Sequence, residues 1–275
     1  MSAVAFWIER VRLWVFWATW LGEIFIFSLV RFWIWWLKFR GKEDRVEAAK
    51  QAVVEFWTGR IIKRMECKVV VEGEENIPME GPLVIMSNHQ SMYDIPFLMA
   101  FMGRMVGFVA KKELFRIPGF SWWMVQLGSL SLDRSDPRSA GKLYTDAALK
   151  MREAGSALVL FPEGTRTRDP GGEMGTFKDG ALRLPAAAEI PILPVSIDGT
   201  RFFSQPEMMR LTRNGGRVVR MRIGKPVIPR SDANARERKE FMAALRETIV
   251  GNYEAIRVDW PMVEEAEKDV ATEGA

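Results

Sequence analysis

A single histidine occurs among the 275 residues, and it lies in a run of polar side chains that extends from Ser87 to Asp94. This run directly follows the apolar segment Leu83 to Met86. A carboxylate near an imidazole can accept the Nδ1 proton and leave Nε2 free to take a proton from a hydroxyl group. The sequence therefore predicts His89 as a general base and Asp94 as its orienting partner, with Ser91 as a weaker candidate nucleophile.

The same run also permits a purely structural interpretation. Ser91 and Asp94 have the spacing of a helix capping box, and Pro96 suits the first turn of a helix that begins near Ile95. The two interpretations are compatible, because a cap at that helix start would hold Asp94 within reach of a histidine on the preceding loop.

A second polar run, Phe161 to Arg166, follows the apolar segment Ala157 to Leu160. Its Pro and Gly are typical of a plain turn. The guanidinium of Arg166 can also bind a phosphate group with two parallel hydrogen bonds, and Glu163 can accept a hydrogen bond from a substrate hydroxyl. Ligands in α/β proteins bind at the carboxyl ends of strands, so we expect both runs to converge on one cleft.

Two further runs are less specific. Basic residues precede and follow the segment from 113 to 133, and either Lys111 or Lys112, together with Arg134, could hold a phosphate monoester, although such residues are commonly a solvated face. The apolar segment Ile192 to Val195 reads as a core strand without chemistry of its own.

The composition limits the possible partners. A net charge of +4 favours an anionic partner, which could be a phospholipid surface, a nucleic acid or a phosphorylated substrate. The lone Cys67 cannot form a disulfide within the chain, and one His with one Cys excludes a His/Cys zinc cluster. Carboxylate-bound magnesium remains possible, but we expect no metal.

The first 40 residues are unusually aromatic, because they contain seven of the eleven tryptophans. Glu23 is the only charged residue from Leu13 to Val30, so this stretch could form one transmembrane helix. Two shorter helices, Ala5 to Trp20 and Ile24 to Phe39, suit the charges better. A helix of about 15 residues rises only about 22 Å, short of a hydrocarbon core of about 30 Å, and tryptophan favours the interface.

We therefore predict a membrane-associated helical hairpin over residues 1–42, with a single span as the alternative; a buried helix pair in a soluble protein is a further possibility. Basic residues Lys38, Arg40 and Lys42 follow it and favour the cytoplasmic side. The aromatic residues cluster here and not among the basic residues of 201–230, which argues against nucleic-acid binding.

Beyond residue 42, helical and strand patterns alternate, which predicts an α/β fold. We expect a connecting helix over residues 43–66, a catalytic domain over 67–258 and an acidic tail over 259–275. The predicted elements are helices Glu43 to Met65, Gly119 to Gln126, Ala140 to Glu153 and Asp232 to Tyr253, and strands Lys68 to Val71, Leu83 to Met86, Gly107 to Ala110, Ser129 to Leu132, Ala157 to Phe161, Ile192 to Ile197 and Val218 to Ile223.

Together the four runs resemble the glycerolipid acyltransferase family, in particular its bacterial 1-acylglycerol-3-phosphate acyltransferases. The first family motif, Asn-His-x-x-x-x-Asp, matches Asn88, His89 and Asp94, and the third, Phe-Pro-Glu-Gly-Thr-Arg, matches residues 161–166 in full. The second motif matches Lys111, Leu114, Pro118, Gly128 and Arg134, and the fourth matches Ile192 to Val195. This resemblance implies a mixed, mostly parallel sheet flanked by helices, preceded by a two-helix membrane anchor.

The resemblance further implies transfer of an acyl group from acyl-CoA or acyl-ACP to the sn-2 hydroxyl of lysophosphatidic acid, which gives phosphatidic acid. His89 and Asp94 would be catalytic, and the substrate phosphate and glycerol would be held by Lys111, Arg134, Glu163, Gly164, Thr165 and Arg166. No cofactor is implied, and the expected location is the cytoplasmic face of the bacterial inner membrane. Another lysolipid acceptor, such as a lyso-aminolipid, and a non-catalytic lipid-binding function are the alternatives; the oligomeric state stays open.

Overall fold

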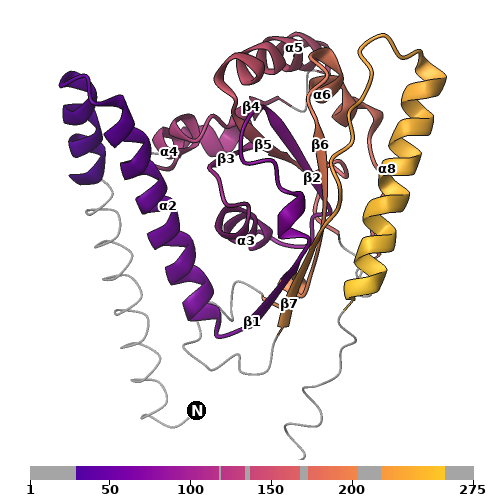
Figure 1. Ribbon diagram of the computed structural model, residues 1–275, viewed down its shortest axis with the longest axis horizontal. Coiled ribbons are helices and arrows are strands. Elements are labelled where there is room, and N and C mark those ends of the chain that lie inside the picture. The colour runs from indigo at the N-terminus through magenta and orange to yellow at the C-terminus, as the bar shows by residue number, and fades with distance from the viewer. Residues whose placement is uncertain (1–28, 118, 134–136, 168–172, 204–217, 258–275) are drawn as a thin grey trace, which may run out of the picture.

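The computed structural model describes residues 29–117, 119–133, 137–167, 173–203 and 218–257. Within these ranges the chain forms one seven-stranded sheet with helices on both faces (Figure 1). The strands are β1 (Lys68–Glu72), β2 (Leu83–Ser87), β3 (Val106–Lys111), β4 (Leu130–Leu132), β5 (Ala157–Leu160), β6 (Ile192–Asp198) and β7 (Val218–Ile223).

The strand order is β1-β7-β6-β2-β5-β3-β4. The five strands from β6 to β4 run parallel to one another, whereas β7 is antiparallel to β6 and pairs in parallel with β1. The prediction of a mixed, mostly parallel sheet is therefore confirmed. In register, Met86 lies opposite Leu160 of β5 and Pro194 of β6, so that β2, β5 and β6 reach the same edge together.

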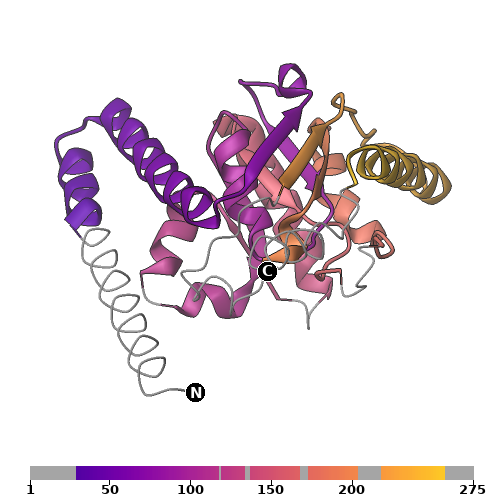
Figure 2. The same cartoon turned by 90° about the horizontal axis from the view of Figure 1, so that it is seen from below.

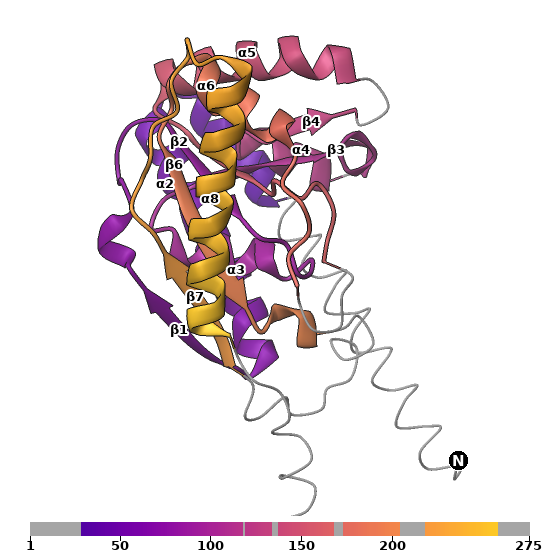
Figure 3. The same cartoon turned by 90° about the vertical axis from the view of Figure 1, so that its right-hand side faces the viewer.

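Alternate residues of the central strand β2 pack on opposite faces of the sheet. Leu83 and Ile85 join a core with α2, α3 and α4, while Val84 and Met86 join a second core with α5, α6 and α8. Figures 2 and 3 show α2 and α8 on opposite sides of the sheet. The helices are α2 (Glu43–Met65), α3 (Asp94–Phe101), α4 (Phe120–Gln126), α5 (Pro137–Ala154), α6 (Arg183–Ala187) and α8 (Ala235–Ile256), and short 3₁₀ turns cover Glu74–Asn76, Lys112–Arg116, Asp179–Leu182 and Thr200–Phe202.

The end of the aromatic N-terminal segment forms a helix over residues 29–39, which agrees with the predicted helix as far as the described residues reach. A turn at residues 40–42 joins it to α2, and the two helices lie side by side at the left of Figure 2. Ile34 and Leu37 are each 1% exposed and pack against Val46 and Ala49 of α2. No helix within the described ranges is long and apolar enough to cross a membrane. The predicted helix Ala5 to Trp20 and almost all of the alternative span lie outside those ranges, as does the acidic tail.

Helix α8 begins at Ala235, three residues later than predicted. The reason is a capping box, in which the side chain of Asn234 accepts from the backbone N–H groups of Arg236 and Glu237, and Glu237 accepts from the N–H of Asn234. Helix α5 begins at Pro137, three residues before the prediction, with a proline in the first turn. The five-residue α6 was not predicted, because it is too short for a periodic pattern.

Replacing Leu193 with alanine tests the central packing of the sheet. Leu193 is fully buried in β6 opposite Ile85, so Leu193→Ala should lower the free energy of unfolding by about 2–5 kcal/mol. Leu149 is 51% exposed on α5, and Leu149→Ala should change the free energy of unfolding by less than about 0.5 kcal/mol. Urea unfolding followed by circular dichroism measures both; equal effects would contradict the assigned core.

Candidate active site

Three loops meet where the neighbouring parallel strands β2, β5 and β6 end. The loop after β2 contains His89, the loop after β5 runs from Phe161 to Thr167, and Asp198 ends β6 just before Thr200. A backbone hydrogen bond of 2.7 Å from the N–H of Thr167 to the carbonyl of His89 joins the first two loops directly. The two polar runs singled out in the sequence therefore do converge.

His89 and Asp94 form a hydrogen-bonded pair. The Nδ1 atom of His89 lies 2.7 Å from Oδ2 of Asp94, and the carboxylate is fully buried while the imidazole remains 17% exposed. An acceptor on Nδ1 favours the tautomer that carries its proton there, so Nε2 is left as the basic nitrogen. The ring of Phe161 stacks on the imidazole with 3.9 Å between centroids and 14° between planes, which limits its rotation.

The carboxylate of Asp94 turns back toward the loop and does not cap helix α3. Its Oδ2 accepts from the backbone N–H groups of Gln90 at 2.7 Å and Ser91 at 3.0 Å as well as from His89. Ser91 accepts a hydrogen bond of 3.1 Å from the N–H of Tyr93, and no side chain caps the helix at its N-cap residue, Tyr93. The capping interpretation is therefore wrong, although Pro96 does lie in the first turn.

The second oxygen of Asp94 belongs to a buried network that the sequence analysis missed. The hydroxyl of Thr200 donates to Oδ1 of Asp94 and lies 3.3 Å from the amide oxygen of Gln90. The amide nitrogen of Gln90 donates to Asp198 at 2.8 Å, and Asp198 forms an ion pair with Arg201. For Asp198, Thr200 and Arg201 the only signal in the sequence was their position at the end of an apolar strand, which is also where the two recognised runs lie.

Helix α8 reaches the same network through Tyr253. Its hydroxyl lies 2.6 Å from a guanidinium nitrogen of Arg201 and 3.4 Å from Asp198. Burial, and then the negative charge of Asp198, raises the pKa of Tyr253 to about 12, so the hydroxyl is neutral at physiological pH.

Asn88 fixes the start of the loop. Its side-chain amide donates to the carbonyl of Ile197 at 2.9 Å and accepts from the N–H of the same residue at 2.8 Å. This pair of hydrogen bonds holds Asn88 against β6, one residue beyond the last pair of Cα partners between β2 and β6, Ser87 and Val195.

Glu163 is 3% exposed and ties three segments together. Its Oε1 accepts from the N–H of His89 at 2.9 Å, while Oε2 accepts from the N–H of Gly175 at 2.9 Å and from the hydroxyl of Thr167 at 3.2 Å. Both oxygens thus bind protein groups, which makes Glu163 a positioning residue for the His89 loop. Its predicted contact with a substrate hydroxyl stays a prediction.

The end of the second run faces solvent. Thr165 and Arg166 are exposed, and no carboxylate within the described ranges pairs with Arg166. Gly164 has a φ of +68°, which explains the glycine, and a Cβ there would also lie 2.8 Å from Nζ of Lys178. Lys178 is a basic residue of this edge that the sequence analysis did not select.

The two lysines left open by the sequence differ in their surroundings. Lys112 forms an ion pair with Asp133, whereas Lys111, exposed at the end of β3, has no ion pair in the part of the chain that the structure describes. Arg134 and Pro118 lie outside the described residues. The described ranges contain no group of three His, Cys, Asp or Glu side chains suited to a metal ion, and the expectation that none is required stays a prediction.

Comparison with known proteins identifies the family of this chain. The Acyltransferase family model matches residues 68–198. A 1-acyl-sn-glycerol-3-phosphate acyltransferase of Borreliella burgdorferi is 31% identical over 70% of this chain and 74% of its own length. The chain belongs to the acyltransferase family. A chloroplastic 1-acyl-sn-glycerol-3-phosphate acyltransferase of Arabidopsis thaliana is 34% identical over 58% of this chain, which spans only 44% of that relative.

A solved structure shares the fold of this chain. The 1-acyl-sn-glycerophosphate acyltransferase PlsC from Thermotoga maritima superposes with a TM-score of 0.71 at 27% identity, covering 92% of this chain and 97% of that protein. The family resemblance inferred from the four sequence motifs is confirmed.

Glu163→Gln tests the positioning of the acyltransferase loops. The amide nitrogen would face either the N–H of His89 or that of Gly175, leaving donor against donor, so the free energy of unfolding should fall by about 1–3 kcal/mol. Arg166→Gln, an exposed change in the same run, should alter it by less than about 0.5 kcal/mol. Chemical denaturation of both variants measures this; a Glu163→Gln protein as stable as wild type would refute the positioning function.

The raised pKa of Tyr253 predicts a pH dependence of stability. Since this pKa, about 12, exceeds the value of about 10 expected in the unfolded chain, the neutral hydroxyl stabilises the fold below about pH 10, and this contribution is lost as the pH rises toward 12. The unfolding free energy of wild type relative to Tyr253→Phe should therefore fall by about 1–2 kcal/mol between about pH 8 and pH 11. Urea unfolding across this range measures it, and a difference that stays constant would contradict the prediction.

Proposed function

We propose that this acyltransferase moves a fatty acyl group from acyl-CoA or acyl-ACP to the sn-2 hydroxyl of 1-acylglycerol-3-phosphate, giving phosphatidic acid. The observation that carries the proposal is the pair formed by His89 and Asp94, whose Nδ1 and Oδ2 atoms are 2.7 Å apart at the end of a parallel strand. Relatives that share the family carry the name of this activity. The acceptor is the part of the proposal that rests on those relatives.

The chemistry requires one base and no covalent acyl-enzyme. Nε2 of His89 takes the proton of the acceptor hydroxyl as its oxygen attacks the thioester carbonyl, and the carbonyl electron pair moves onto oxygen. Collapse of the tetrahedral intermediate forms the ester, breaks the carbon–sulfur bond and releases a thiolate, which takes the proton back from His89. Asp94 stabilises the imidazolium between the two transfers.

The oxyanion of that intermediate needs hydrogen-bond donors. The backbone N–H groups of His89, Gln90 and Ser91 donate to Glu163 and Asp94 instead. We assign the oxyanion donors to another segment, the exposed residues Thr165 and Arg166, which lie next to His89 in the loop that Thr167 bonds to it. The N–H of Gly164 donates to the carbonyl of Phe161.

The glycerol phosphate would be held by the cations at this edge. Arg166 and Lys111 are exposed and form no ion pair with a described residue, so their charges are available to a phosphate. We assign Arg134, Gly164 and Thr165 to the same substrate site by their place in the motifs, with Glu163 supporting it from below. No metal or cofactor enters this scheme, and the acyl donor is a co-substrate.

We further propose that the protein lies on the cytoplasmic face of the inner membrane, held by its N-terminal helices. Phe32, Trp35 and Phe39 are 65%, 58% and 77% exposed on the 29–39 helix, and aromatic side chains of this density favour the interface of a bilayer. Such attachment concentrates the enzyme beside an acceptor and a product that both reside in the membrane.

Transfer from palmitoyl-CoA and palmitoyl-ACP to lysophosphatidic acid in detergent micelles tests the reaction. His89→Ala should lower kcat by at least about 10²–10⁴, because general base catalysis contributes that factor. Ser91→Ala should cost less than about tenfold, since it removes the hydrogen bond that the Ser91 hydroxyl accepts from the N–H of Tyr93 and leaves the backbone N–H that donates to Asp94. Retained turnover in His89→Ala would overturn the base, and an inactive Ser91→Ala would favour a serine nucleophile.

Absence of phosphatidic acid with wild type would direct the assay to other acceptors. Turnover of a lyso-aminolipid alone would keep the mechanism and replace the substrate. Lipid binding without turnover of any acceptor would leave a non-catalytic lipid-binding protein.

A further inference from the structure

The 29–39 helix and α4 face each other at a fixed separation. Ile34 and Leu37 are buried between the N-terminal helix and α2, and Trp122 and Trp123 of α4 pack against the same cluster. This packing fixes the positions of the side chains beside it, because both helices are held against one buried cluster.

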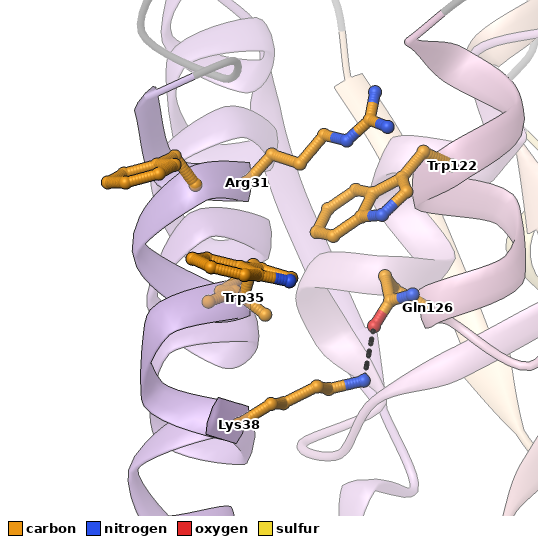
Figure 4. Close-up of a pocket in the computed structure, with 7 residues that line it drawn as sticks. Arg31, Trp35, Lys38, Trp122 and Gln126 are labelled. Carbon is orange, nitrogen blue, oxygen red and sulfur yellow. Dashed lines mark hydrogen bonds between the residues drawn. The ribbon is translucent and has the colours of Figure 1, made fainter. Parts of the chain in front are cut away.

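A pocket of about 580 Å³ opens between these two helices (Figure 4). Arg31, Trp35 and Lys38 line one wall; their spacing of four and three residues places them on one face of the N-terminal helix. Trp122 and Gln126 line the other wall, one helical turn apart on α4. None of the lining residues belongs to the loops that carry His89, Glu163 or Thr200, so this is a separate site.

The pocket carries two positive charges and no negative one. The guanidinium of Arg31 lies over the ring of Trp122, 5.6 Å from its centroid, and Nζ of Lys38 lies 3.3 Å from Oε1 of Gln126. Neither cation forms an ion pair with any residue that the structure describes, and no lining residue is acidic. Two cations without a carboxylate partner that line one concavity attract an anion.

The surface around the pocket indicates where that anion comes from. Phe32, Trp35 and Phe39 project from the N-terminal helix, and Phe120 and Val125 of α4 are 42% and 62% exposed beside it. Aromatic and aliphatic side chains exposed in this number favour the boundary between acyl chains and headgroups. A membrane bound by these side chains would therefore hold its lipid phosphates at the depth of the pocket.

We propose that this pocket binds the phosphate of an anionic phospholipid headgroup, as a second lipid site distinct from the catalytic one. Arg31 and Lys38 are about 10 Å apart along the helix axis, a span that their long side chains can close onto one phosphate. The guanidinium fork binds two phosphate oxygens, the ammonium binds a third, and the indole of Trp122 keeps Arg31 in place. A lipid with net negative charge is preferred, because a choline group would bring a third cation into the pocket.

The inference rests on the membrane attachment in the proposed function but not on the acyl transfer. Its test is flotation of the full chain with two kinds of vesicle, pure phosphatidylcholine and phosphatidylcholine mixed with phosphatidylglycerol at three parts to one. The pocket variant is Arg31→Gln with Lys38→Gln. The matched control is Arg40→Gln with Arg45→Gln, which removes the same charge from exposed positions outside the pocket, one in the turn after the N-terminal helix and one in α2.

Wild type should bind the phosphatidylglycerol vesicles more tightly, and the pocket variant should lose at least about tenfold in affinity for them, because it removes both cations that would bind the phosphate. The control should lose no more than about threefold, because neither Arg40 nor Arg45 lines the pocket and the general attraction of their charges to the membrane is screened by salt. Circular dichroism establishes that both variants are folded as wild type is.

Equal losses of vesicle affinity in the two variants would overturn the headgroup site, because a general electrostatic attraction would then explain the binding. Inorganic phosphate should compete with the headgroup and release wild type beyond the effect of sodium chloride at the same ionic strength. Wild type that binds inorganic phosphate but floats equally with both kinds of vesicle would assign the site to a free anion and overturn the lipid. Wild type that floats with neither vesicle would overturn both the pocket and the proposed attachment. Failure of acyl transfer in micelles with intact flotation would refute the catalytic proposal alone and leave the headgroup site supported.

Discussion

The buried carboxylate of Asp94 is the constraint on which the arrangement of the site depends. A charge without contact to water needs donors on both oxygens, because an unpaired buried charge costs several kcal/mol. His89, Gln90 and Ser91 supply donors to one oxygen and Thr200 to the other. These donors follow the ends of β2 and β6, so the two loops must lie side by side for the carboxylate to be satisfied.

Glu163 repeats this principle for the neighbouring loop. One buried carboxylate accepts from the N–H groups of His89 and Gly175 and from the hydroxyl of Thr167. It thereby joins the loops after β2 and β5 to Gly175, twelve residues beyond Glu163. The apolar sheet brings the strand ends together, but the two buried acids decide how the loops are folded above it. Functional polar groups and structural polar groups are in this way parts of one network.

Much of the fold and the heart of the site could be predicted from the sequence. The strands were recognisable because short apolar runs alternate with helical patterns, and His89 with Asp94 because their relation is local. The hydrogen-bond network around Thr200, Asp198 and Tyr253 could not be predicted, because it joins residues more than 50 positions apart that share no periodic pattern. The helix cap proposed for Ser91 and Asp94 was wrong, because spacing alone does not show which N–H groups donate to a carboxylate. Glu163 was recognised as important, but the sequence could not reveal that protein groups occupy both of its oxygens.

The distance along the chain between Asp94 and its partners has a consequence for biosynthesis. Thr200 follows Asp94 by 106 residues, and Tyr253 follows Gln90 by 163. Contacts of such high order form late in folding, because a long loop must close before they contribute. On the ribosome, a nascent chain that ends before α8 carries β2, β5 and β6 with the face that α8 later covers still open to water. Such a chain presents apolar strands and an incomplete cage for a buried acid, so it is prone to aggregation until α8 has been synthesised and has packed on the sheet.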